Sequence, residues 1–142
     1  MDYIQSLYLS AGNYGCYLFC LINVAEEYLG SSFIVEDVIE QCIDKGFIKF
    51  NKLNYNDPDN FYVKEPARVL EYLTGVKWDV RKVYDIDYKK ETGEYIIEFW
   101  SKDNGATGHF ARINRGYNSL QKSYSVDKGK IHSLRVCKVV ID

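Results

Sequence analysis

The hydrophobic pattern of this chain changes its period once, at Val76, and this change constrains the fold more than any other feature. Before Val76, apolar residues recur at the three- and four-residue spacing that marks one face of an α-helix. From Val76 onward they alternate with polar residues, as Val76, Trp78 and Val80 do, which is typical of a half-buried β-strand. Helices followed by strands predict an α+β fold.

Three helices are predicted in the first half. They run from about residue 14 or 16 to Gly30, over about residues 35–45, and from Pro66 to Gly75, with a polar loop at residues 51–60. Strands are predicted at about 76–81, 94–100, 108–114, 119–126 and 131–141. Short links at residues 115–118 and 127–130 predict that the last three strands are antiparallel neighbours. We therefore expect one domain over residues 1–142, with helices at about 14–75 packed on an antiparallel sheet at about 76–142.

Length and composition limit the class of protein. A chain of 142 residues, 46% hydrophobic and 27% charged, fits one globular domain that needs no disulfides. The first residues carry Asp2 where a secretory signal carries a basic residue, and no apolar run approaches the roughly 20 residues of a membrane span. We expect a cytoplasmic protein in which Cys20, Cys42 and Cys137 are buried, reduced thiols.

The charge is unevenly distributed along the chain. Residues 101–142 hold eight Lys and Arg against three Asp, although the whole chain has a formal charge of -2. Such a basic C-terminal sheet could contact an anionic partner, but no nucleic-acid module or phosphate-binding glycine loop frames these residues. Direct nucleic-acid binding is therefore not expected, and no spacing of Cys and His predicts a metal or cofactor.

Cys16 is the first candidate for chemistry. It follows Gly12, Asn13 and Gly15 in a segment that reads as a loop running into the first predicted helix. Unpaired N–H groups and the helix dipole at such a position lower the pKa of a thiol, and the same N–H groups can stabilise an oxyanion. A small buried residue at a helix start would look the same.

A nucleophilic thiol needs a base, and the chain has two histidines. His109 opens a predicted strand after a glycine-bearing loop, whereas His132 reads as a surface residue. Asp127 ends the strand that follows, so an antiparallel turn would return it toward His109, where a carboxylate could orient the imidazole. Each of the two residues also has an ordinary structural interpretation, His109 in a strand and Asp127 in a turn.

Together, Cys16 at a helix head, Gly108-His109 opening a strand and Asp127 closing the next resemble the papain-like cysteine peptidases. Within that group, the pattern is most similar to the branch that cleaves double-glycine leader peptides. The segments at 15–19, 65–70 and 108–110 also resemble an uncharacterised family of phage and plasmid proteins from spirochaetes and related bacteria. The resemblance implies a single papain-like domain with Cys16 as nucleophile, His109 as general base and acid, and Asp127 as the orienting group.

One position departs from that pattern. The leader peptidases carry a Gln about six residues before the Cys to complete the oxyanion hole, and this chain has Ser10 there. Asn13 or Gln5 are the alternative oxyanion donors. Loss of an oxyanion donor typically costs about 10²- to 10³-fold in rate.

The sequence thus leaves three hypotheses. The first is a thiol hydrolase, a peptidase or amidase acting on a peptide or protein through an acyl-enzyme. The second is a non-catalytic protein of a mobile element that binds and inhibits a host nuclease or defence complex, as anti-CRISPR proteins do. The third is a scaffold or assembly component. The high count of tyrosine, 13 residues, suits a binding surface but also follows from AT-rich coding.

Overall fold

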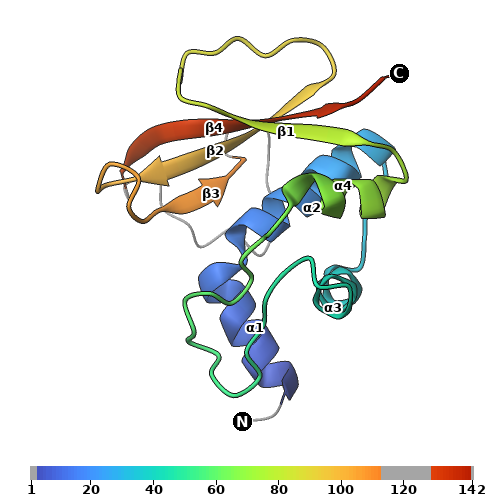
Figure 1. Cartoon of the computed structure of the whole chain (residues 1–142), viewed down its shortest axis with the longest axis vertical. Coiled ribbons are helices and arrows are strands. Elements are labelled where there is room, and N and C mark those ends of the chain that lie inside the picture. Colours follow the sequence, from blue (N-terminus) through green and yellow to red (C-terminus); the bar gives the residue numbers. More distant parts are fainter. Residues whose placement is uncertain (1–2, 113–128, 142) are drawn as a thin grey trace.

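The computed structural model of this protein describes residues 3–112 and 129–141. Helices come first and strands follow, so the predicted α+β fold is confirmed, with N-terminal helices packed against a four-stranded antiparallel sheet (Figure 1). The helices are α1 (Tyr3–Tyr14), α2 (Cys16–Leu29), α3 (Val35–Asp44) and α4 (Pro66–Thr74), and the strands are β1 (Trp78–Val83), β2 (Glu94–Ser101), β3 (His109–Ala111) and β4 (Lys130–Val139).

Helices α2, α3 and α4 lie where the apolar spacing predicted them. Helix α2 begins at Cys16 and ends before Gly30, and α4 begins at Pro66 and ends before Gly75. Within the described residues, no helix has both the length and the apolar character needed to cross a membrane.

The segment before Cys16 was predicted to be a loop, and this prediction is wrong: the segment forms helix α1. Leu7 and Ala11, four residues apart, are both buried in the core, so packing outweighs the weak helix propensity of Gly12 and Asn13. The N–H of Gly15 donates to the carbonyl of Ala11 at 2.9 Å, and α2 begins at the next residue. Cys16 therefore follows a break of one residue between two helices.

The order of strands in the sheet is β1-β4-β2-β3, with every neighbouring pair antiparallel. This order differs from the predicted meander, since β4 lies between β1 and β2 and is paired on both sides. The reason is apolar side chains on both faces of β4, with Leu134 and Val136 on one face and Cys137 in the main core on the other. The strand predicted at 119–126 lies outside the described residues.

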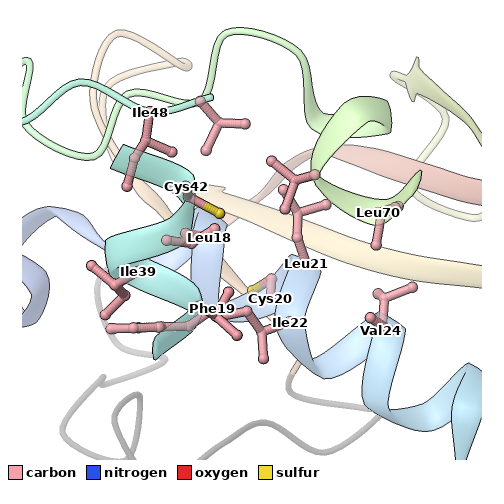
Figure 2. Packing of buried hydrophobic residues seen from close by; sticks show 14 of the residues in the cluster. Leu18, Phe19, Cys20, Leu21, Ile22, Val24, Ile39, Cys42, Ile48 and Leu70 are labelled. Carbon is pink, nitrogen blue, oxygen red and sulfur yellow. The ribbon is translucent and has the colours of Figure 1, made fainter. Parts of the chain in front are cut away.

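The core lies between the helices and one face of the sheet. Between Leu18 and Ala25, helix α2 is buried on nearly all its faces. Its side chains there pack in one cluster with Cys42 of α3 and Leu70 of α4 (Figure 2). Strand β2 contributes Ile97 to this core, while the adjacent Ile96 belongs to a smaller cluster with Leu134 and Val136. The first turn of α2 is in a different environment, and its last turn is exposed.

Candidate functional site

Cys16 is the first residue of α2, as the sequence predicted, and its sulfur contacts the sheet. The backbone N–H of Phe110, in β3, the last strand of the described sheet, donates to Cys16 Sγ at 3.5 Å. On the neighbouring strand β2, Phe99 is the residue paired with Phe110. The site is thus a junction between the head of α2 and strand β3 (Figure 1).

The protonation state of the Cys16 thiol differs from the expectation for a helix head. Burial raises the pKa of Cys16 above its ordinary value, and the N–H groups of Phe110, Tyr17 and Cys16 itself only partly offset that effect. The helix position favours the thiolate, but the loss of water around the sulfur outweighs it. The resting group is therefore a neutral thiol, and its reaction requires a base.

His109 opens β3, as predicted, and pairs with Trp100 of β2. It immediately precedes Phe110, so the strand that contacts Cys16 is the strand that carries the predicted base. Its ring is half-buried, with Nε2 shielded from solvent. Asp127, the predicted orienting residue, lies outside the described residues.

The predicted oxyanion donors are placed along α1. Gln5 is exposed and lies about 13 Å along the helix axis from Tyr14, well beyond the length of its side chain. Asn13 lies in the last turn of α1, and its side chain is outside the described part of the structure. Ser10 is fully buried, and its hydroxyl has no hydrogen-bond partner among the described residues. Ser10 therefore faces the protein interior.

A pocket of about 490 Å³ opens at Cys16. Gly108 and Phe110, on either side of His109 in the sequence, line it, whereas His109 does not. Aromatic residues form much of the wall, and the ring of Tyr17 stacks on that of Phe110 with centroids 4.1 Å apart. Cys16 thus borders a cavity whose wall is largely aromatic.

The opposite wall of the pocket comes from the loop between α3 and α4. Phe61 is buried with a φ of 64°, a left-handed conformation that is unusual for an aromatic residue. The loop is held by hydrogen bonds from Asn51 N–H to the Asn60 side chain at 2.7 Å and from the Tyr14 hydroxyl to the Asn56 carbonyl at 2.8 Å. The turn-forming residues at 51–60 predicted this loop, but nothing in them indicated that it closes a pocket.

Two glycines allow the close approach of backbone around the site. A Cβ at Gly15 would lie 2.6 Å from the Ala11 carbonyl oxygen. A Cβ at Gly108 would collide with the carbonyl oxygen of Trp100. Only glycine fits both positions without a shift of the backbone next to Cys16 and His109.

Arg135 also lines the pocket, although it was not among the residues predicted for the site. It lies on β4 between the buried Leu134 and Val136, and its guanidinium lies over the ring of Phe110 at 5.2 Å. An arginine between apolar residues of a central strand was the signal that could have identified it.

The other cysteines differ from Cys16. Cys20, Cys42 and Cys137 are buried, as predicted, and burial raises the pKa of Cys42 to about 11 and that of Cys137 to about 12. The structure describes all four cysteines, and none forms a disulfide. Within residues 3–112 and 129–141, no group of three His, Cys, Asp or Glu side chains is placed to hold a metal ion.

Comparison with known proteins places the chain in a family. No curated protein and no solved structure matches it significantly. The sequence model of one family matches residues 4–139, which run from α1 to β4 and include Cys16, His109 and the pocket. The chain therefore belongs to the family described as "Protein of unknown function, DUF261".

Proposed function

We propose that this protein is a thiol hydrolase of papain-like arrangement, a peptidase or amidase in which Cys16 is the nucleophile. One observation carries the proposal: the Cys16 sulfur, which accepts the Phe110 N–H, lines a pocket of about 490 Å³. The thiol, a hydrogen-bond donor and space for a substrate therefore coincide.

His109 is the proposed base because it is adjacent to Phe110 on the strand that contacts the thiol. It takes the proton of Cys16, and the thiolate attacks the substrate carbonyl to form a C–S bond. The N–H groups at the head of α2 are the proposed oxyanion donors. His109 then gives its proton to the leaving amine as the C–N bond breaks, and water hydrolyses the thioester to a carboxylate and the free thiol. Asp127 is proposed to orient the His109 ring.

Acyl-enzyme trapping tests this assignment. The protein is incubated with p-nitrophenyl acetate, and the acetylated residue is identified by mass spectrometry. We expect a hydroxylamine-sensitive acetyl group on Cys16, absent in Cys16→Ala, and a fall in acylation of at least about 10²-fold in His109→Gln. His132→Gln is the matched control, because it removes the other histidine and should leave the rate unchanged. Acetylation that spares Cys16, or equal rates in the two histidine variants, would overturn the assignment.

A binding protein that inhibits a host nuclease or defence complex is the second candidate. It is favoured by Ser10, which stands where the leader peptidases have an oxyanion amide and is fully buried here. In a phage-protection or pull-down assay, this candidate predicts that Cys16→Ala keeps full activity. Loss of activity in a variant that remains folded would favour the hydrolase.

A further inference from the structure

Arg135 is a half-buried cation that has no counter-ion within the described part of the chain. No carboxylate among the described residues forms an ion pair with it, whereas Arg68, Arg81 and Arg112 each have one. A guanidinium that has lost part of its hydration normally gains a carboxylate or phosphate in exchange. Its place in the pocket beside Cys16 suggests that a ligand supplies that group.

The guanidinium is held in a fixed orientation. Its central carbon lies 5.2 Å from the ring centroid of Phe110 and 5.8 Å from that of Phe99. Its Nη1 donates to the Ser133 hydroxyl at 3.0 Å and, at the longer distance of 3.4 Å, to the Leu134 carbonyl. Rings cover the face of the fork, and Ser133, Leu134 and the Tyr17 side chain accept some of its N–H groups, so the N–H groups that these described neighbours leave are available to a carboxylate.

The pocket lining indicates which anion fits. Arg135 is the one formally charged residue among the described residues that line the pocket, and Tyr14, Tyr17, Phe61 and Phe110 supply aromatic surface. One positive charge in an apolar cavity balances one negative charge. A carboxylate on an apolar body therefore matches the pocket better than a phosphate dianion, which would need further cations.

We infer that the pocket selects peptide or amide substrates that carry a carboxylate close to the scissile bond, and that Arg135 is the residue that binds this carboxylate. The inference rests on the proposed function, because it takes the Cys16 end of the same pocket as the reacting end. The carboxylate is either the C-terminus of the peptide or an acidic side chain.

Two reagents of similar size separate charge recognition from reactivity. Iodoacetate carries a carboxylate and iodoacetamide is neutral, and both alkylate thiols. The ratio of their rates at Cys16, measured by mass spectrometry and divided by the same ratio for glutathione, reports the attraction for the anion. We expect a normalised ratio of about 10 for the unmodified chain, a value near 1 in Arg135→Gln and an intermediate value in Arg135→Lys.

Lys138→Gln is the matched control. Lys138 is exposed on the same strand, so its loss removes an equal charge outside the pocket and should leave the ratio unchanged. An unchanged iodoacetamide rate in Arg135→Gln shows that the pocket is intact. A normalised ratio near 1 in the unmodified chain, with normal iodoacetamide labelling, overturns the inference alone. Failure of both reagents to label Cys16 overturns the proposed function and the inference with it.

Competing peptides distinguish the two sources of the carboxylate. Acetyl-Gly-Phe with a free C-terminus, its C-terminal amide, and acetyl-Glu-Phe amide are tested for protection of Cys16 against iodoacetamide. Protection by the free acid alone indicates a C-terminal carboxylate, and protection by the Glu peptide indicates an acidic side chain. Equal protection by the neutral amide would contradict carboxylate recognition.

Discussion

The first turn of α2 and its middle belong to one helix but have different surroundings. From Leu18 to Ala25 the helix is enclosed by α3, α4 and the sheet, and Cys20 is completely buried there (Figure 2). One turn earlier, Cys16 accepts a backbone N–H from β3 and opens on a pocket. Burial alone therefore does not distinguish a structural thiol from a candidate nucleophile, whereas the groups around the sulfur do.

This difference divides the helix into two parts with separate roles. The middle should determine the stability of the fold and tolerate little change. The first turn should determine reactivity, and its position depends on Gly15, on β3 and on the loop that leads to Gly108. Substitutions in the two parts should therefore change different measurements.

The largest expected effect on stability comes from the middle of α2. Leu21 is fully buried, so Leu21→Ala leaves a cavity and should lower the free energy of unfolding by about 3 kcal/mol in urea denaturation. Leu29→Ala, at the exposed end of the same helix, is the control and should change it by less than about 0.5 kcal/mol. Similar values for the two variants would mean that the middle of α2 is not the centre of the core.

The junction before Cys16 should be the next most sensitive position. In Gly15→Ala, the added methyl group meets the Ala11 carbonyl at 2.6 Å and the Phe19 ring at 3.1 Å, so the helices must shift. We expect a loss of about 2 kcal/mol in stability and slower alkylation of Cys16. Ser31→Ala, in the exposed bend after α2, is a control outside the junction and should leave both values unchanged. Unchanged Cys16 alkylation in Gly15→Ala would show that the junction does not position the thiol.

A smaller loss of stability is expected from the ion pair that links the end of β3 to α2. Arg112, which follows β3, is completely buried and donates to Glu27 at 3.0 Å and to Asn23 at 2.8 Å. Glu27→Gln removes the counter-charge but keeps an acceptor. Because the Glu27 side chain is 47% exposed, we expect a loss of about 1.5 kcal/mol rather than the larger cost of breaking a fully buried pair.

Urea denaturation measures this effect. Glu40→Gln, on the exposed face of α3, is the control for loss of one negative charge. If both variants lose the same stability, the Arg112–Glu27 pair does not hold β3 against the helix.

The smallest effect is a pH dependence in the loop before Gly108. Hydrogen bonds from Thr107 and Ser101 lower the pKa of Asp103 to about 2. The pKa of Asp103 is lower in the folded than in the unfolded protein, so the ionised carboxylate stabilises the fold. This stabilisation is complete above pH 3.8, the ordinary pKa of Asp, and is lost as the pH falls through about 2. An NMR titration should give a midpoint near 2 for the Asp103 carboxyl, and Thr107→Val should move it toward 3.8. A midpoint near 3.8 in the unmodified chain would contradict the hydrogen bonds of this loop.

The sequence predicted those elements whose signals are local. The apolar stripe of α3 and the glycines after α2 and α4 identified the helices, and the alternation of β1 and the aromatic run of β2 identified strands. Helix α1 was missed because Gly12 and Asn13 favour a loop, and only the burial of Leu7 and Ala11 shows why they are helical. The position of β4 depends on pairing with strands far away in the sequence, which no local pattern encodes.

The candidate site was predictable in part for the same reason. The helix head at Cys16 and the start of β3 at His109 follow from local signals, and the structure brings the two elements into contact. The raised pKa of the thiol, the wall formed by Phe61 and the place of Arg135 in the pocket arise from packing between distant segments. The role of Asp127, the single papain-like domain and the cytoplasmic location stay predictions.

The most direct test of the division within α2 is the rate at which each of the four cysteines is alkylated. Intact protein is treated with iodoacetamide near neutral pH, and labelling is followed by peptide mass spectrometry. Cys16 should be labelled at least about ten times faster than Cys20, Cys42 and Cys137, because it alone among them lines the pocket. Equally slow labelling of all four thiols would contradict a reactive site at the head of α2.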